Sequence, residues 1–233
     1  MSLRKAMIFA AGRGERMRPL TDATPKPLLG VRGRMLIEHH LEKLAAIGVR
    51  EVVVNISHLA PQFPLALGDG SRWNLAIHYS DEGPQPLETG GGILRALPLL
   101  GDAPFIVVSA DIVSDFDYAR LPAEPDGLAH LVMVPNPDFH PRGDFHLDGS
   151  RLCEDGKGDR LTFGNIGVYR PELVAGATST RFKLLPMFQR AMRADRLTGE
   201  RHDGFWRNLG TPAQLAELEA IGWPAWSSQE PKD

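Results

Sequence analysis

The chain has 233 residues, of which 42% are hydrophobic and 24% are charged, and its formal net charge is −3. These values are ordinary for a globular protein, and the slight acidic excess argues against a nucleic acid as the partner. No apolar run approaches the ~20 residues that cross a bilayer, so we expect no membrane partner. The single cysteine, Cys153, excludes an internal disulfide and suits a reducing cytoplasm.

Patterns typical of strands and helices alternate through the first half of the sequence. An amphipathic pattern predicts a helix over 35–47, and a second helix is expected over about 91–99 with Thr89 as its cap. Short apolar or β-branched runs predict four strands, at 6–10, 51–55, 75–79 and 104–109. This alternation is typical of a parallel sheet with crossover helices.

The second half contains shorter segments. Helices are expected over 182–194 and from Thr211 onward, and strands at 128–134, 144–147, 161–169 and 206–209. The middle strands suggest a small, partly antiparallel sheet that lies as a lid over a site. We therefore predict a Rossmann-like α/β fold of three layers, with an open, mostly parallel sheet and a small β-rich lid region. One domain is expected over residues 1–227, followed by a disordered tail over 228–233.

The most informative segment follows the first expected strand. Residues 10–21 read AAGRGERMRPLT, and the tetrapeptide PKPL follows at 25–28. Small residues at the carboxyl end of a strand let backbone N–H groups approach phosphate oxygens. The small residues are Ala10, Ala11, Gly12 and Gly14, and the same loop adds the cations Arg16, Arg18 and Lys26. The segment therefore predicts a cradle for a triphosphate.

Two other phosphate-binding loops are excluded by their details. A Walker loop requires Gly-Lys-Ser/Thr at its end, and no such tripeptide follows Gly14. A dinucleotide-binding loop requires a third glycine, and its position is occupied by Met17.

Two further segments carry candidate ligands. Asp111 follows the strand expected at 104–109, where a carboxylate can hold Mg²⁺ against nucleotide phosphates; a turn cap is the alternative. Glu88, Gly90 and Gly91 belong to the sequence LETGGG at the start of a helix. The glycines allow a flat base to lie on the backbone, and Glu88 can orient the nucleotide or an acceptor; a flexible connector is the alternative.

On these residues the sequence resembles the family of nucleotidyltransferases that make nucleoside-diphosphate sugars, over about residues 5–221. The resemblance implies that family's fold, Mg²⁺ as the cofactor, and a nucleoside triphosphate and a sugar 1-phosphate as substrates. In the implied reaction a sugar-phosphate oxygen attacks the α-phosphorus and pyrophosphate leaves. Arg16 is then expected to neutralise the pyrophosphate, and Lys26 to bridge the nucleophilic phosphate and the α-phosphate.

The resemblance also implies ligands for the metal and the sugar. Asp111 and Asn208 are the expected metal ligands, although many members of the family have Asp at the position of Asn208. Gly143 and Asn165 are expected to contact the sugar, and Lys183 is expected to hold its phosphate. A solvated lysine is the alternative for Lys183.

Segments 86–92, 97–105 and 142–145 are similar to those family members that transfer a uridylyl group to N-acetylmuramate 1-phosphate in bacterial peptidoglycan recycling. This resemblance implies UTP as the donor. The lactyl carboxylate of that sugar implies a cation in its pocket, either Arg142 or Lys183. Two alternatives stay open: a guanylyltransferase acting on mannose or heptose 1-phosphate, and a sensor that binds a nucleotide sugar without turnover. The sequence leaves the oligomeric state open.

Overall fold

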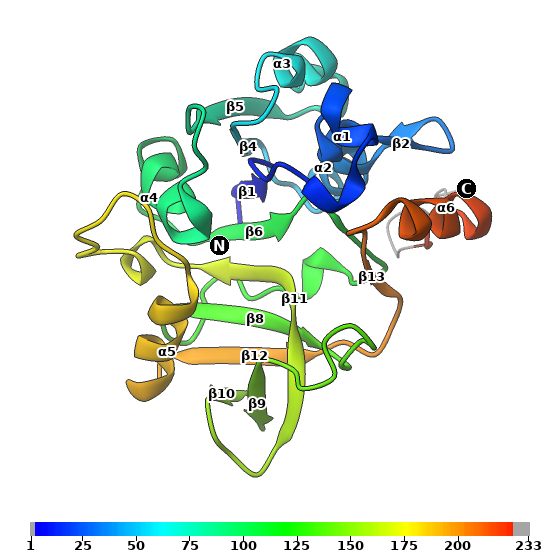
Figure 1. The fold of residues 1–233 in the computed structure, drawn as a ribbon. Helices are drawn as coiled ribbons and strands as arrows, with labels where there is room; N and C mark the ends of the chain where they lie inside the picture. The colour runs from blue at the N-terminus through cyan, green and yellow to red at the C-terminus, as the bar shows by residue number, and fades with distance from the viewer. Residues whose placement is uncertain (1–2, 226–233) are drawn as a thin grey trace, which may run out of the picture.

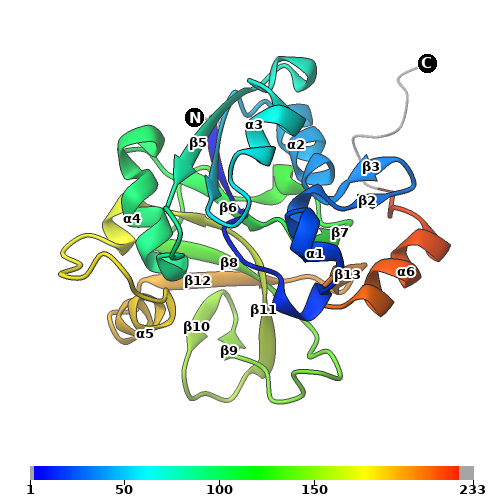
Figure 2. The same cartoon turned by 45° about the horizontal axis from the view of Figure 1, so that its top comes forward.

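The computed structural model describes residues 3–225, and a nine-stranded sheet runs through the middle of the molecule (Figures 1 and 2). The strand order is β5-β4-β1-β6-β11-β8-β12-β10-β9. The first four strands are parallel to one another, namely β5 (Ala76–Asp81), β4 (Glu51–Ile56), β1 (Lys5–Phe9) and β6 (Phe105–Ser109). The tail predicted over 228–233 lies outside the described residues.

The strands of the second half continue this sheet. They are β8 (Ala129–Val134), β9 (Phe145–Asp148), β10 (Arg151–Cys153), β11 (Asp159–Tyr169) and β12 (Leu197–Arg201). β11 pairs antiparallel with β6, from Ile166 opposite Val108 to Tyr169 opposite Phe105. The expectation of a separate small sheet is therefore wrong, because hydrogen bonds join both halves into one sheet. The sequence patterns missed β10 and β12, which are only three and five residues long.

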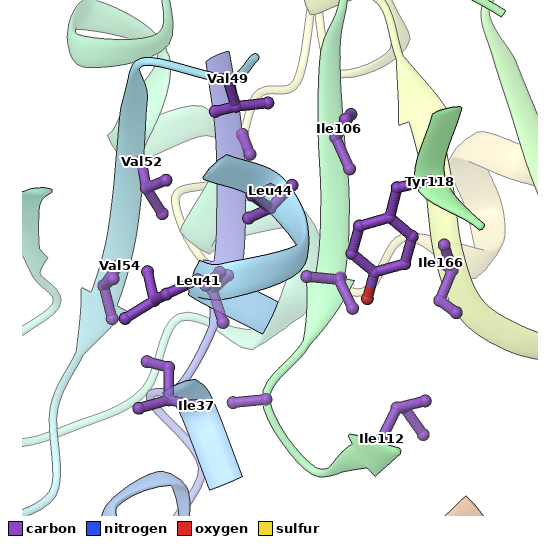
Figure 3. Close-up of a cluster of buried hydrophobic side chains, with 14 of the residues drawn as sticks. Ile37, Leu41, Leu44, Val49, Val52, Val54, Ile106, Ile112, Tyr118 and Ile166 are labelled. Carbon is purple, nitrogen blue, oxygen red and sulfur yellow. The ribbon is translucent and has the colours of Figure 1, made fainter. Parts of the chain in front are cut away.

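Helices cover both faces of the sheet, which confirms the three-layer α/β prediction. Ile8 of β1 packs in one cluster with α2 (Leu36–Ala46) and α3 (Gln62–Leu67). The next side chain toward the N-terminus, Met7, packs in a second cluster with α4 (Glu88–Leu100) and α5 (Leu185–Arg193). Figure 3 shows the first cluster, in which Leu41 of α2 lies beside Val54 of β4. Burial on both faces explains why these parallel strands read as continuous apolar runs.

A second two-stranded sheet, a small hairpin and several short helices flank the large sheet. β7 (Ile112–Ser114) pairs antiparallel with β13 (Trp206–Asn208), and β2 (Gly30–Val31) pairs with β3 (Arg34–Met35). The short helices are α1 (Leu20–Ala23), η1 (Glu15–Met17), η2 (Lys26–Leu28), η3 (Ser71–Trp73), η4 (Tyr118–Arg120) and η5 (Pro171–Leu173). Within residues 3–225, no helix is both long and apolar enough to cross a membrane.

The last helix, α6 (Pro212–Ile221), begins where the sequence predicts. The Thr211 side chain caps it by accepting a hydrogen bond from the Gln214 N–H. The helix lies beside the β2–β3 hairpin (Figure 2), where Arg32 donates to the carbonyl oxygens of Glu219 and Ala220. This contact holds the C-terminal helix against the N-terminal part of the chain.

The helix predicted over 91–99 begins earlier, at Glu88, and Thr89 is not its cap. Thr89 lies in the first turn of α4, where its Oγ1 accepts a hydrogen bond from the Leu184 N–H at 3.0 Å. This bond joins the start of α4 to the segment that precedes α5.

Candidate functional site

Two adjoining cavities open at the carboxyl ends of the parallel strands. The larger has a volume of about 980 Å³ and the smaller about 380 Å³. The larger cavity contains eight of the site residues predicted from sequence: Ala10, Ala11, Gly12, Gly14, Arg16, Lys26, Glu88 and Asp111. The smaller contains Asn165 and Lys183, and Phe9, Glu88, Thr89 and Ser109 line both. The carboxyl edge of an open parallel sheet is where such folds bind ligands.

The loop after β1 offers backbone donors to the larger cavity. The Ala10 N–H donates to Asn55 Oδ1 at 2.7 Å. Within the described part of the chain, the N–H groups of Ala11 and Gly12 have no acceptor. Gly14 has a φ of 63°, and a Cβ there would lie 2.9 Å from Thr21 Cγ2, so this tight turn requires glycine. The loop is therefore shaped to present N–H groups to an anion.

The three cations predicted for the phosphate cradle occupy different places. Lys26 Nζ lies 2.8 Å from Asp111 Oδ2, with only 11% of the lysine side chain exposed. Arg16 is exposed, and its guanidinium lies so close to Gly210 that a Cβ there would be 2.9 Å from Arg16 Nη2. Arg18 lines neither cavity and pairs instead with Asp22 at 3.1 Å. The prediction that Arg18 contributes to the phosphate cradle is therefore wrong.

The two predicted metal ligands lie next to one strand pair: Asp111 directly precedes β7, and Asn208 is the last residue of β13. Asn208 is opposite Ile112 in the antiparallel β7–β13 pair, and the Leu209 N–H donates to the Asp111 carbonyl oxygen at 2.8 Å. The side-chain Oδ1 of Asn208 is buried and has no donor within residues 3–225. Buried polar atoms normally have a partner, so this orphaned oxygen fits a cation ligand. Carboxylate and amide oxygens are also ligands that Mg²⁺ accepts.

Asn55 and Glu82, which the sequence patterns did not predict as site residues, form a hydrogen-bonded pair in the wall of the larger cavity. Glu82 is 8% exposed, and its two carboxylate oxygens accept from Asn55 Nδ2 and from the Leu87 N–H, each at 2.6 Å. Because Asn55 also accepts from Ala10, one network joins the ends of β1, β4 and β5 to the start of α4. The sequence held a signal for part of it, because Asn55 is the last residue of the strand expected at 51–55, whereas Glu82 falls in the loop after the strand expected at 75–79.

The glycine-rich start of α4 has a packing role. The N–H groups of Gly90 and Gly91 both donate to the Phe182 carbonyl oxygen, at 2.9 and 3.1 Å. A Cβ at Gly91 would lie 2.2 Å from the Thr180 carbonyl oxygen. Neither glycine lines a cavity. Their lack of side chains lets the segment 180–182 pack against the start of α4, on the face that the sequence analysis gave to the base.

Glu88 stands at the junction of the two cavities. It is a non-glycine residue with a φ of 63°, a conformation that non-glycine residues seldom adopt and that is enriched at functional sites. Its Oε1 lies 3.8 Å from Arg181 Nη2. The strained backbone thus holds a carboxylate where the two cavities meet.

The smaller cavity combines aromatic walls with a few polar groups. Its aromatic residues are Phe9, Phe145, Phe163, Tyr169 and Phe188. Asn165 has a φ of 56° at the point where the register of β11 against β8 shifts, which is typical of a bulge. Asp144 also lines this cavity, with its Oδ2 accepting from the Phe163 N–H at 2.8 Å.

Gly143 and Arg142 line neither cavity. Gly143 has a φ of 61°, and a Cβ there would lie 2.5 Å from Asn136 Oδ1. The glycine therefore allows a tight turn that delivers Asp144 to the smaller cavity.

A buried basic cluster supports β7 from behind. Lys43 Nζ donates to the Ser114 carbonyl oxygen at 2.7 Å, and His39 Nε2 lies 3.1 Å from the same atom. Burial lowers the pKa of Lys43 to about 7 and the pKa of His40 to about 3. Burial also lowers the pKa of His39 well below its usual value. The cluster anchors the strand that begins immediately after Asp111.

A family model for nucleotidyl transferases matches residues 5–134. Over 230 residues the chain is 46% identical to the N-acetylmuramate alpha-1-phosphate uridylyltransferase of Neisseria meningitidis serogroup B, covering 95% of this chain and 99% of that protein. It is 34% identical to the protein of the same name in Caulobacter vibrioides, covering 92% of this chain and 95% of that protein. The chain therefore belongs to the family of sugar-1-phosphate nucleotidyltransferases, as its motifs indicated.

More distant relatives differ in base and sugar. A mannose-1-phosphate guanyltransferase of Aspergillus fumigatus is 30% identical, over 89% of this chain and 61% of its own length. A crystal structure of a glucose-1-phosphate thymidylyltransferase from Bacillus anthracis has a TM-score of 0.81, covering 93% of this chain and 94% of that one at 17% identity. This structural likeness confirms the predicted fold class.

Proposed function

We propose that this chain transfers the uridylyl group of UTP to N-acetylmuramate 1-phosphate, giving UDP-N-acetylmuramate and pyrophosphate. The observation that carries the proposal is the junction of the two cavities. A cavity of about 980 Å³ with phosphate-binding features opens beside one of about 380 Å³, and they share Glu88 and Ser109. A triphosphate in the first and a sugar in the second would bring the sugar phosphate to the α-phosphorus.

The proposed chemistry consists mainly of positioning and charge neutralisation. The N–H groups of Ala11 and Gly12 hold phosphate oxygens, and Arg16 neutralises the departing pyrophosphate. Lys26 draws the nucleophilic phosphate and the α-phosphate together, where negative charge gathers in the transition state. Mg²⁺, with Asp111 and Asn208 as its protein ligands, supplies further positive charge to the phosphates when it is bound.

For the base, we propose contacts from the wall formed by Gln85, Pro86 and Glu88. The Glu82 carboxylate holds this wall through the Leu87 N–H. Gly90 and Gly91 support it from behind, through the segment 180–182 that they admit.

For the acceptor sugar, we propose contacts from Asn165, Asp144 and Lys183. The Asn165 amide suits the N-acetyl group, and Gly143 acts by directing Asp144. Lys183 is exposed at the smaller cavity and has no ion-pair partner among residues 3–225, so its ammonium is available to an anion. That anion is either the phosphate or the lactyl carboxylate of the sugar.

The experiment that tests the proposal measures pyrophosphate release with Mg²⁺, crossing UTP, GTP, CTP and dTTP with a panel of sugar 1-phosphates. Turnover confined to UTP and N-acetylmuramate 1-phosphate is the expected result. Turnover with GTP and mannose or heptose 1-phosphate would keep the mechanism and replace the substrates. Nucleotide binding without turnover for any pair would favour a sensor. Because UTP is a cytoplasmic metabolite, we further propose that the chain acts in the cytoplasm, in peptidoglycan recycling.

A further inference from the structure

The smaller cavity has a charge balance that disfavours the anion proposed for it. Glu88 and Asp144, which both line this cavity, carry carboxylates, and Lys183 carries an ammonium. A sugar 1-phosphate brings further negative charge, and N-acetylmuramate adds a carboxylate of its own. Glu88 has a counter-cation, since its Oε1 lies 3.8 Å from Arg181 Nη2. Asp144 therefore opposes an anionic ligand unless its charge is compensated as well.

The side chain that pairs with Asp144 is His140. Its Nε2 lies 3.0 Å from Asp144 Oδ1, and the two side chains are 39% and 36% exposed. The other carboxylate oxygen, Oδ2, accepts from the Phe163 N–H at 2.8 Å. Within residues 3–225, no other side chain bonds to this carboxylate. His140 lines neither cavity, so it acts on a ligand of the smaller cavity through Asp144.

The turn between β8 and β9 fixes this pair. The His140 N–H donates to the Pro137 carbonyl oxygen at 2.8 Å, and the Gly143 N–H donates to the His140 carbonyl oxygen at 3.2 Å. Asn136 ties the same turn to β11 by donating to the Arg160 carbonyl oxygen at 2.9 Å. The backbone thus brings the imidazole back to a carboxylate that follows it by four residues in the chain.

The other charged groups around His140 leave this pairing to it. Arg160 of β11 donates to the Asp144 carbonyl oxygen at 3.3 Å, so its guanidinium is bonded to the backbone of the turn. Asp138 and Arg142 flank His140 in the sequence, and both are exposed and form no ion pair among the described residues. Histidine is the side chain whose charge ordinarily changes between about pH 5 and 8. The charge that faces Asp144 therefore depends on pH.

We propose that His140 is a positioning residue of the acceptor site: it holds the Asp144 carboxylate and, when protonated, offsets its negative charge so that an anionic sugar phosphate can enter the smaller cavity. A neutral imidazole keeps the hydrogen bond but leaves the charge uncompensated. Binding of the sugar phosphate is therefore linked to protonation of His140, and its affinity falls as the pH rises. The inference rests on the proposed function in taking a sugar phosphate as the occupant of the smaller cavity.

The test measures KM for N-acetylmuramate 1-phosphate at saturating UTP between about pH 6 and pH 8.5. His140→Gln keeps a donor near the position of Nε2 and removes the charge, while ionisation of the sugar phosphate itself is the same for both proteins. Near pH 6 the KM of H140Q should be about fivefold above the wild-type value, the size expected for one partly exposed ion pair, and the two values should converge near pH 8.5. Both kcat and the KM for UTP should stay unchanged, because His140 lies outside the nucleotide cavity.

Three more variants separate the charge of His140 from its fold. His140→Arg carries a permanent charge, so its KM should stay about fivefold below that of H140Q at every pH. In an Asp144→Asn background, His140→Gln should have no further effect on KM, because the carboxylate is gone. His78→Gln is the matched control, since His78 is 41% exposed, lies 3.5 Å from Glu51 and lines neither cavity. H78Q should keep the wild-type pH profile, and circular dichroism checks the fold of each variant.

The inference is overturned if folded H140Q keeps the wild-type KM across the pH range, or if H140R raises KM as much as H140Q does. Failure of the proposed function gives a different result. If the substrate panel identifies another sugar 1-phosphate, the same difference between wild type and H140Q is expected with that substrate. If no pair is turned over, calorimetric titration of UDP-N-acetylmuramate at the same pH values makes the comparison without turnover, and equal affinities of wild type and H140Q near pH 6 would overturn the inference.

Discussion

The Lys26→Met variant offers a sharp test of the role given to the loop after β1. Methionine keeps most of the apolar stem of lysine and removes the ammonium that lies 2.8 Å from Asp111 Oδ2. Removing a single preorganised donor from a transition-state site typically lowers kcat by about 10²–10³, which corresponds to roughly 2.7–4 kcal/mol. We expect a loss of at least this size, measured as pyrophosphate release at saturating UTP and sugar phosphate.

The effect on stability should be much smaller. The Asp111 side chain is 32% exposed, so water can solvate the carboxylate once Lys26 is gone. An ion pair with one partly solvated member contributes about 1 kcal/mol or less, and the free energy of unfolding in urea should change by no more than that.

Arg18→Met is the matched control. Arg18 belongs to the same loop and loses the same charge, but it pairs with Asp22 and both side chains are more than half exposed, at 63% and 56%. Its kcat should stay within about twofold of the wild-type value, because surface pairs contribute little. The assignment of Lys26 is refuted if K26M retains near-normal kcat, or if R18M loses as much activity as K26M.

Three further predictions follow from the surrounding contacts. Glu82→Leu leaves the Asn55 amide and the Leu87 N–H without an acceptor. We therefore expect a loss of about 1–3 kcal/mol in the free energy of unfolding and a raised KM for UTP. A normal KM would contradict a role for Glu82 in shaping the wall proposed to contact the base. Lys183→Met should raise KM for the sugar phosphate by about tenfold, as expected for loss of one charged contact, while Arg142→Met should not, and equal effects would refute the choice of Lys183. Because burial lowers the pKa of His40 from 6.5 to about 3, the unfolded chain binds the extra proton below pH 6.5. His40 should therefore lower the free energy of unfolding by up to about 1.4 kcal/mol per pH unit as the pH decreases below that value, and His40→Gln should remove this part of the slope in urea titrations while the part from buried His39 remains.

Much of the site could be predicted because its chemistry is encoded locally. A strand of apolar residues followed by small residues and cations specifies a phosphate loop from neighbours in sequence alone, and Gly12, Gly14, Lys26 and Asp111 do line one cavity. The start of α6 was equally predictable, since a cap depends only on Thr211 and the next few residues. Local sequence therefore determined the parallel half of the sheet, the glycine-containing loop after β1 and the family.

Other features depended on contacts between distant segments, and only the tertiary structure decided them. Arg18 and Lys26 are both cations of one loop, but the turn between them sends one toward Asp22 and the other to Asp111, 85 residues away. The sequence predicts that Gly91 supports the base, but in the structure the Thr180 carbonyl oxygen lies against this glycine. The strands of the second half, expected to form a separate lid, belong to the large sheet because β11 pairs antiparallel with β6. Sequence patterns report the preferences of neighbouring residues, whereas pairing between strands, the direction of a long side chain and the burial of an unpartnered oxygen arise only when the whole chain has folded.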